Sequence, residues 1–300
     1  MRVLDNVLDG LMRRYRERVP DVSKVTSALI DHNIIQKQED ISNDHIAFRT
    51  IGVPHLGIAS LEKIFLKHGY LPKDEYFFER KKLNARWYAP PNSKYPRIFL
   101  SELKVSDLPK DYQKIITSYT DEVKSDPVDN IDLDSGEDID LFLHKSLWRL
   151  PSWSDYKKLQ EVSEYAAWVI YNRYYLNHYT ISVHNLQDGY STIKQFNKFI
   201  SSIGIILNDS GGEIKISKDG LLQQSSTVSE MVEASFNGGE KKMIPGSYIE
   251  FCERKVLPQF KHLEISRIKR EHRRDGFETG NADKIFESTY LNQTEKRDSN

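Results

Sequence analysis

Three residues that can bind a metal ion lie in separate segments of strand-like composition. His45 lies in N-D-H-I-A-F-R-T and His178 in L-N-H-Y-T-I-S-V, so each histidine follows Asp or Asn and precedes β-branched and aromatic residues. Glu250 lies in a third such segment, S-Y-I-E-F-C-E-R. Two imidazoles and one carboxylate are the protein ligands of the facial triad, which leaves positions on Fe(II) open. The pattern predicts a metal-dependent oxygenase.

Strand geometry places these candidate ligands on the more polar face of each segment. Successive side chains of a strand alternate between its two faces, so His45 shares a face with Arg49 and His178 shares one with Thr180. Arg49 is four residues after His45, about 13 Å along an extended strand. Its guanidinium matches a carboxylate in shape and charge. Arg49 is therefore a candidate catalytic residue that holds a substrate carboxylate, with a salt bridge as the alternative.

Other polar residues compete for, or add to, this site. His184 shares a face with His178, but it lies about 20 Å along the strand, which is too far for both to bind one ion. Glu253 is a second acidic residue in the third segment. Gln224 and Ser226 lie on a further strand of the same kind and are candidate substrate-binding residues. Their alternative role is plain hydrogen bonding within the sheet.

Composition limits the classes of protein to which the chain can belong. Its 300 residues are 38% hydrophobic, enough for a sizeable core. The net charge of -1 gives no field that attracts nucleic acid. The one cysteine, Cys252, fits a reducing compartment. There is neither a run of about 18 apolar residues nor an apolar leader segment. We therefore expect a cytoplasmic protein without nucleic-acid or membrane partners.

The segments around His45 and His178 begin two similar modules. The order strand–helix–strand–strand recurs, with a further strand expected within residues 76–89, and such recurrence indicates an internal repeat. The first module is expected to comprise His45–Thr50, Ile58–His68, 76–89 and 95–103. The second is expected to comprise Tyr179–Val183, Ser191–Ile203, Leu221–Val228 and Ser247–Arg254. We predict an α+β fold in which two βαβββ-type modules form a curled sheet around a metal pocket.

The remaining segments are expected to surround these modules. Apolar residues recur with a helical period in residues 1–40, which predicts an N-terminal helical cap. Residues 41–300 are expected to form a single catalytic domain. Its parts are module one (41–103), a helical insert (104–176), module two (177–256) and a C-terminal segment (257–300).

The insert contains an acidic stretch, D-P-V-D-N-I-D-L-D-S-G-E-D-I-D. It matches a calcium loop poorly, because Gly136 falls one place early and the closing glutamate is missing, so we expect a solvated loop. A single helix is expected from about Ser154, a plausible N-cap, to Tyr175. The C-terminal residues 294–300 are expected to be a frayed tail.

Five motifs in the same order resemble one known family. The chain resembles the vicinal-oxygen-chelate superfamily and, within it, the Fe(II)-dependent 2-oxoadipate dioxygenase/decarboxylase (hydroxyglutarate synthase) family, from about His45 to Tyr290. The motifs are D-H-I-A-F-R-T, F-L-S-E-L, Y-A-A-W-V-I…L-N-H-Y-T, G-S-Y-I-E-F-C-E-R and G-F-E-T-G-N-A-D-K-I-F-E-S-T. The resemblance implies that His45, His178 and Glu250 bind Fe(II) and that Arg49 holds the substrate.

The resemblance also implies a reaction, within lysine catabolism. A 2-oxo acid would chelate the metal through its keto oxygen and C1 carboxylate, and O₂ would then release CO₂ and hydroxylate the remaining chain. In this way 2-oxoadipate would become 2-hydroxyglutarate without a second co-substrate. Arg49 would hold the distal carboxylate, and Gln224 and Ser226 would meet substrate oxygens.

Two other functions are compatible with the same fold. A lyase or isomerase of the glyoxalase kind would use Zn or Ni with a fuller set of protein ligands, and a non-catalytic binder would sequester a small molecule. The complete set of three candidate ligands disfavours the binder. The sequence does not indicate an oligomeric state.

Overall fold

The computed structural model describes residues 3–298 and contains one eight-stranded sheet made of two modules. The first module consists of β1 (Asn43–Ile51), α3 (Ile58–Lys67), β2 (Leu71–Phe78), β3 (Leu83–Ala89) and β4 (Arg97–Leu103). The second consists of β5 (Leu176–Ser182), α8 (Ile193–Ser202), β6 (Lys215–Ile216), β7 (Leu222–Ser226) and β10 (Tyr248–Arg254). A hairpin of β8 (Met231–Ser235) and β9 (Lys241–Pro245) is inserted before β10 and forms a separate small sheet.

The strand order shows that the two modules are equivalent. It runs β2-β3-β4-β1-β5-β10-β7-β6, so the first strand of each module lies at the centre and pairs in parallel with the last strand of its own module. β1 and β5 join the modules in antiparallel. The predicted α+β architecture with two βαβββ-type modules is confirmed, including the extra strand, because the segment expected at 76–89 covers the end of β2 and all of β3; β2 begins five residues earlier than expected, at Leu71.

The outer, apolar face of the sheet is covered by helices. Phe48 of β1 packs on Phe65 of α3, with ring centroids 5.8 Å apart, and Phe251 of β10 packs on Phe196 of α8 at 4.9 Å. The same contact thus recurs in both modules, as expected when alternate residues of half-buried strands face a helix. The opposite face holds the polar side chains of β1, β5 and β10, so these helices leave it free for a site.

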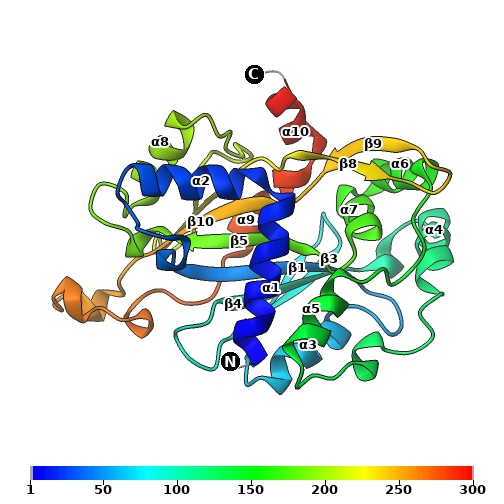
Figure 1. Ribbon diagram of the computed structural model, residues 1–300, viewed down its shortest axis with the longest axis horizontal. Helices are drawn as coiled ribbons and strands as arrows, with labels where there is room; N and C mark the ends of the chain where they lie inside the picture. The colour runs from blue at the N-terminus through cyan, green and yellow to red at the C-terminus, as the bar shows by residue number, and fades with distance from the viewer. Residues whose placement is uncertain (1–2, 299–300) are drawn as a thin grey trace.

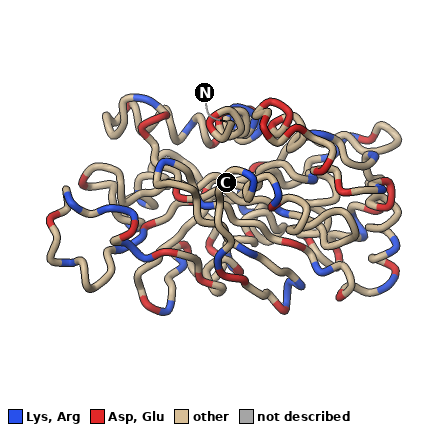
Figure 2. Tube along the Cα trace, turned by 90° about the horizontal axis from the view of Figure 1, so that it is seen from below, with Lys and Arg blue, Asp and Glu red and all other residues tan. Residues whose placement is uncertain are grey.

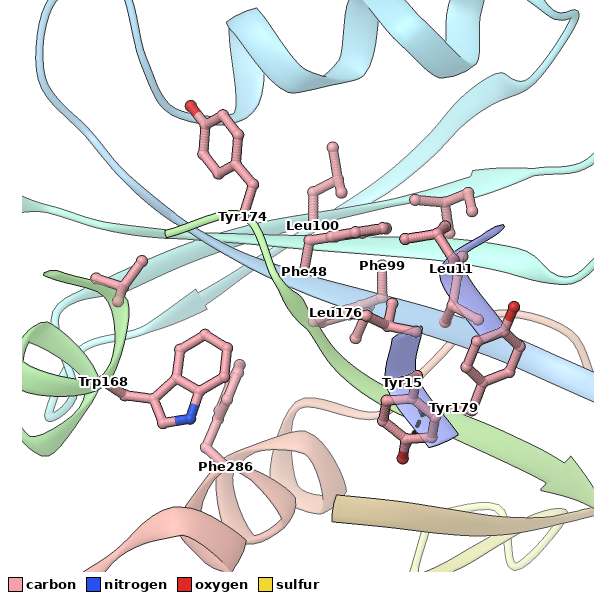
Figure 3. Close-up of a cluster of buried hydrophobic side chains, with 14 of the residues drawn as sticks. Leu11, Tyr15, Phe48, Phe99, Leu100, Trp168, Tyr174, Leu176, Tyr179 and Phe286 are labelled. Atoms are coloured by element: carbon pink, nitrogen blue, oxygen red, sulfur yellow. Dashed lines mark hydrogen bonds between the residues drawn. The ribbon is translucent and has the colours of Figure 1, made fainter. Parts of the chain in front are cut away.

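Helix α1 (Val3–Arg18) crosses in front of the central strands, and α2 (Pro20–Asp31) lies alongside β10 (Figure 1). Tyr15 of α1 packs on Tyr179 of β5 at 5.4 Å within the core cluster (Figure 3), and its hydroxyl donates to the backbone oxygen of Tyr248. The predicted helical period is therefore present. We propose the division into a cap of residues 1–40 and a catalytic domain of 41–300, with the internal limits given above, because α1 and α2 precede the repeat and cover its outer face.

The insert between the modules differs from its prediction in two places. The acidic stretch is not a loop throughout, because its end forms α5 (Gly136–His144). Ser135 caps this helix, and acidic residues in its first turn favour the positive end of the helix dipole. Buried Asp140 on α5 accepts from Arg14 of α1 at 3.0 Å, which explains why a helix rather than a solvated loop forms here. α4 (Lys110–Thr120) precedes this stretch.

The long helix expected from Ser154 to Tyr175 is two helices, α6 (Trp153–Val162) and α7 (Glu164–Asn172). The N-cap of α6 is Ser152 rather than Ser154. Ser163 separates the two helices with an extended backbone, and its hydroxyl accepts from Ala166 to begin α7. The chain turns at this point, which brings α7 towards the polar face of the sheet.

The C-terminal segment crosses the polar face of the sheet. It contains α9 (Thr279–Ile285) and α10 (Leu291–Asp298). The expected frayed tail is wrong for the described residues up to 298, because Arg297 pairs with Asp21 and Glu230 at 2.8 Å each. Residues 299–300 lie outside the described part of the chain.

Acidic and basic residues are interspersed along the trace (Figure 2). None of the helices within residues 3–298 is both long enough and apolar enough to cross a membrane.

Candidate metal centre

The three predicted ligands lie on adjacent central strands. In the pairing of β5 with its neighbours, His178 lies opposite Ala47 of β1 and Tyr248 of β10, and Thr180 lies opposite Glu250. His45 precedes Ala47 by two residues on β1, so it lies beside the row of Thr180 and Glu250. The sheet therefore brings together side chains that are more than 70 residues apart in sequence.

Two irregularities in the β1–β5 pairing fall at the two histidines. The register shifts between Asn43 and Ile46, where β1 has one extra residue, and again near His178, where β5 has one extra residue. A β-bulge of this kind bends the strand and redirects side chains. At each bulge the residue before the histidine can therefore reach the histidine ring, which regular alternation would prevent.

The ligand atoms converge on one point. The candidate donor atoms of His45, His178 and Glu250 all lie within 4.8 Å of one another. His45 Nε2 is 3.4 Å from one carboxylate oxygen of Glu250, and His178 Nε2 is 3.1 Å from the other. The three residues are 2%, 5% and 1% exposed. A buried carboxylate between two imidazoles is a donor set that suits a divalent transition metal.

The residues before the two histidines fix the orientation of the rings. Nδ1 of His45 lies 2.9 Å from Asp44 Oδ1, and Nδ1 of His178 lies 3.0 Å from Asn177 Oδ1. Both oxygens accept, so each Nδ1 carries a proton and each Nε2 is the ring atom that faces Glu250. An acceptor behind a ligating histidine is the usual arrangement at metal sites. Of the nearby groups considered from the sequence, Asp44 and Asn177 thus have this role.

Replacing Asn177 by alanine is expected to lower metal affinity about 10- to 100-fold while the fold is retained, because His178 loses the acceptor that fixes its ring. Isothermal titration of the metal-free protein measures this. Asn197→Ala is the matched control, since this buried asparagine accepts from Ser225 away from the triad. Equal affinities for Asn177→Ala and the control would show that Asn177 does not support the site.

The environment of the triad separates the pKa values of its members. Burial raises the pKa of Glu250, but His45 and His178 outweigh burial and hold that pKa well below its usual range. Burial lowers the pKa of His178. Burial also favours a lower pKa for His45, but the carboxylates of Glu250 and Asp44 together have the larger effect and raise the pKa of His45. The ionised carboxylate is thus ready to bind a cation, and binding would displace protons from the histidines.

A buried charge network holds Asp44 in place. Arg254 donates to both of its carboxylate oxygens, at 2.7 and 2.8 Å, and Arg97 donates at 3.3 Å. Burial raises the pKa of Asp44, but the two guanidinium groups outweigh burial and hold it well below its usual range. Asp44 is therefore an anion behind His45, whereas its counterpart Asn177 is neutral. In the sequence, only the Asp-His and Asn-His pairs distinguish the two histidine sites in this respect.

Two further residues hold or cover the triad. Gln224, on the strand next to Glu250, donates from Nε2 to Glu250 Oε1 at 2.7 Å and accepts from Asn281 at 3.0 Å. The ring of Phe277 stands edge-on against His45, with centroids 4.8 Å apart. The C-terminal segment, through Phe277, therefore covers the metal centre beside His45.

Arg49 lies at the other end of the polar face. It is 1% exposed, and its guanidinium donates to Thr289 Oγ1 at 2.9 Å and to the backbone oxygen of Phe286 at 3.1 Å. The rings of Tyr165 and Trp168 lie 5.1 and 5.0 Å from its central carbon. Among the described residues no carboxylate lies within ion-pair distance of Arg49, and its Nε has no partner. A buried cation without an anion is costly, which suggests that a ligand supplies the anion.

The other residues considered from the sequence lie outside the triad. Ser226 is buried, and its hydroxyl hydrogen-bonds Ser288 at 2.8 Å. Glu253 accepts from the backbone N–H of Ile193 at the start of α8. His184 is not on the strand of His178, because β5 ends at Ser182, and its Nδ1 accepts from the backbone of Arg254. The placement of His184 on the same strand was wrong, but its exclusion from the metal site stands.

Replacing His184 by asparagine is expected to reduce the acid sensitivity of the metal-free protein. Burial lowers the pKa of His184 from 6.5 to about 4. The neutral ring favours folding above pH 6.5, and this contribution is lost as pH falls through 4, because the unfolded chain binds the proton first. The wild type should lose about 2 kcal/mol more unfolding free energy than the variant between pH 7.5 and 4.5. Urea unfolding at both pH values tests this, and identical losses would contradict it.

The fold and the site define a class of protein. A curled sheet of two βαβββ modules is a glyoxalase-like fold, and the buried two-histidine, one-glutamate centre is consistent with a metal site in it. A putative glyoxalase superfamily protein from Ralstonia eutropha JMP134 has the same fold, with a TM-score of 0.69 at 19% identity over 90% of this chain and 84% of that one.

Closer similarities are specific to one family. A family model described as 2-oxoadipate dioxygenase/decarboxylase matches residues 7–265, so the chain belongs to the 2-oxoadipate dioxygenase/decarboxylase family. The chloroplastic enzyme of that name from Arabidopsis thaliana is 45% identical over 86% of this chain and 71% of its own length. The chloroplastic/amyloplastic enzyme from Oryza sativa subsp. japonica is 43% identical over 97% of this chain and 80% of its own. A crystal structure of the Oryza sativa hydroxyglutarate synthase in complex with 2-oxoadipate aligns with a TM-score of 0.87 at 42% identity, over 96% and 92% of the two chains.

The relatives contradict the expected cytoplasmic location. Both curated relatives are named as plastid proteins. The expectation rested partly on the single cysteine, which excludes an internal disulfide in every compartment and so does not distinguish the cytosol from another reducing compartment. The charge of the first residues was likewise no positive evidence for the cytosol.

Proposed function

We propose that this chain is an Fe(II)-dependent dioxygenase that converts 2-oxoadipate and O₂ to 2-hydroxyglutarate and CO₂. The observation that carries the proposal is the pairing, on one face of the sheet, of the buried His45–His178–Glu250 triad with the uncompensated cation of Arg49. Family membership adds the reaction, and the similar rice enzyme was crystallised with 2-oxoadipate.

The triad would hold the metal through His45 Nε2, His178 Nε2 and the carboxylate of Glu250. Fe(II), when bound there, supplies the redox chemistry that lets O₂ react with a 2-oxo acid, and three protein ligands leave positions for both. Two histidines and one carboxylate with open positions are the facial triad of non-haem Fe(II) oxygenases. Catalytic zinc sites can use the same donor set, so the reaction named for the family is what favours iron. Asp44 and Asn177 accept hydrogen bonds from the Nδ1–H groups of the two histidines, so the Nε2 atoms are the ones available to bind the metal.

Arg49 would bind the distal carboxylate of the substrate. Among the described residues no carboxylate pairs with it at ion-pair distance, and the aromatic rings of Tyr165 and Trp168 lie around it. A water-poor environment of this kind strengthens the attraction of a cation for a carboxylate. Holding the far end of the substrate also positions the 2-oxo end at the metal, and such positioning lowers the barrier to reaction. We propose that Gln224 and Ser226 contribute polar contacts on the same face, while Gln224 also orients Glu250.

The overall reaction balances without a further reductant. 2-Oxoadipate and O₂ together contain the atoms of 2-hydroxyglutarate and CO₂, so the substrate supplies all the electrons that O₂ takes up. The C1–C2 bond breaks, C1 leaves as CO₂, C2 becomes the new carboxylate, and a hydroxyl is added to the remaining chain.

Anaerobic loading with Fe(II), followed by 2-oxoadipate and air, tests the proposal. We expect one O₂ consumed and one CO₂ released for each 2-hydroxyglutarate that mass spectrometry detects. Protein treated with a chelator or loaded with Zn(II) is the control and should be inactive. Product formed without O₂ uptake would instead favour the glyoxalase-type lyase or isomerase. Binding of 2-oxoadipate without turnover would favour the non-catalytic binder.

A further inference from the structure

Tyr248 lies between the metal centre and Arg49. It is two residues before Glu250 on β10, so both side chains point to the same face of the sheet. Across the sheet it is in register with His178, which in turn pairs with Ala47. Ala47 is midway between His45 and Arg49 on β1. Tyr248, His178 and Ala47 thus form one row across the polar face, and this row lies between the row of Glu250 and the position of Arg49.

The side chain of Tyr248 is buried but its hydroxyl is unused. The residue is 0% exposed, and its ring packs on the ring of His178 with centroids 4.8 Å apart. By distance and angle its Oη has no regular hydrogen-bond partner, although the guanidinium of Arg49 lies close enough to act on the phenol oxygen through its charge and as a donor. The hydroxyl hydrogen of Tyr248 is therefore without an acceptor. Buried hydroxyls are almost always hydrogen-bonded. A buried hydroxyl hydrogen without an acceptor beside a candidate substrate site therefore indicates that a ligand provides the acceptor.

Arg49 and Tyr248 present complementary donors. The two Nη atoms of Arg49 already donate to Thr289 and to the backbone of Phe286, whereas its Nε is unpartnered. A carboxylate has two oxygens, and one N–H from Nε can meet only one of them. Among the described residues, the phenol of Tyr248 is a second buried donor without an acceptor, and it lies near Arg49. Ala47, which lies between His45 and Arg49 on β1, carries only a methyl side chain.

We propose that Tyr248 determines specificity for dicarboxylic 2-oxo acids by donating its hydroxyl hydrogen to the distal carboxylate beside Arg49. The inference rests on the proposed function for the orientation of the substrate. Tyr248 and Arg49 then form one carboxylate site, in which a neutral donor and a charged donor each take one oxygen. A six-carbon 2-oxo acid that lacks the distal carboxylate gains no binding free energy from Tyr248 or from Arg49.

Tyr248→Phe removes the hydroxyl and keeps the ring on His178, so it tests the proposal without opening a cavity. Two 2-oxo acids of equal chain length are compared, 2-oxoadipate and the monocarboxylate 2-oxohexanoate. KM and kcat are measured for both with the Fe(II)-loaded enzyme, and calorimetry measures 2-oxoadipate binding without O₂. For 2-oxoadipate we expect KM and Kd to rise about 10- to 100-fold, as for the loss of a hydrogen bond to a charged group. For 2-oxohexanoate we expect less than a twofold change.

Tyr179→Phe is the matched control. Tyr179 is also buried and lies on the neighbouring strand, but it points to the opposite face and donates to the backbone of Leu8. Its variant should keep the wild-type preference for 2-oxoadipate, and circular dichroism confirms folding of both variants. An unchanged preference in Tyr248→Phe, or an equal loss for both acids, would overturn the inference.

The outcomes separate this inference from the proposed function. Wild-type turnover together with an unchanged Tyr248→Phe variant overturns only the role of Tyr248. A wild type that binds 2-oxoadipate through Tyr248 without consuming O₂ supports the role of Tyr248 and overturns the proposed reaction.

Discussion

His178→Ala is expected to abolish retention of the metal, with a loss of at least about a thousandfold in metal affinity and in kcat/KM. The triad offers only three protein ligands, and removal of one leaves a two-ligand site that contributes several kcal/mol less to binding the ion. Elemental analysis after gel filtration measures the metal, and O₂ uptake measures turnover. The protein should stay folded, because His178 packs on Tyr248 and leaves only a modest cavity when truncated.

His184→Asn is the control for this experiment. His184 is also a mostly buried histidine close to β10, but it contacts backbone atoms rather than the triad. The His184→Asn variant should retain the metal in full stoichiometry. Full metal content and activity in His178→Ala would show that another set of residues binds the ion.

Arg49→Met is expected to raise KM for 2-oxoadipate about 30-fold or more, because the distal carboxylate loses a buried charged partner. If Arg49 also aligns the bound substrate, kcat falls as well, whereas purely uniform binding affects KM alone. The substrate-free variant should be at least as stable to urea as the wild type, since methionine removes a buried cation that has no anion. Steady-state kinetics and urea unfolding measure the two effects.

Arg173→Met is the matched control for Arg49. Arg173 is likewise buried, has an unpartnered Nε, and lies near a tryptophan ring, but it donates to the backbone of Trp148 in the insert. Its loss should leave KM unchanged. If Arg49→Met also leaves KM unchanged, the carboxylate binds elsewhere.

The sequence was sufficient to predict that His45, His178 and Glu250 come together, because each is a metal-binding residue type on a strand and the two histidines occupy equivalent places in a repeat. His45 and His178 begin the central strands of the two modules, and alternation placed Arg49 on the face of His45. The N-terminal helical cap and the strands were likewise predicted from the periodicity of apolar residues. The structure confirms that His45, His178 and Glu250 converge, and their role as ligands of a particular metal stays a prediction.

The features that the sequence did not predict depend on tertiary contacts. A β-bulge results from how two strands pair, so the shifts at Asp44 and near Asn177 leave no mark in either strand alone. The break at Ser163 results from α7 packing towards the sheet, and α5 forms because Asp140 meets Arg14. The role of Gln224 behind Glu250 depends on the β7–β10 register. The Asp-His and Asn-His pairs in the sequence were the one local signal that could have identified the residues that orient the two histidine rings.

The central claim is that His45, His178 and Glu250 bind one ion, and anomalous diffraction from crystals grown with Fe(II) and 2-oxoadipate under anaerobic conditions tests it most directly. We predict a single iron peak at coordination distance, roughly 2 Å, from both Nε2 atoms and the Glu250 carboxylate, with the distal carboxylate of the substrate at Arg49. An iron peak elsewhere, or ordered substrate at the triad without iron, would contradict the account.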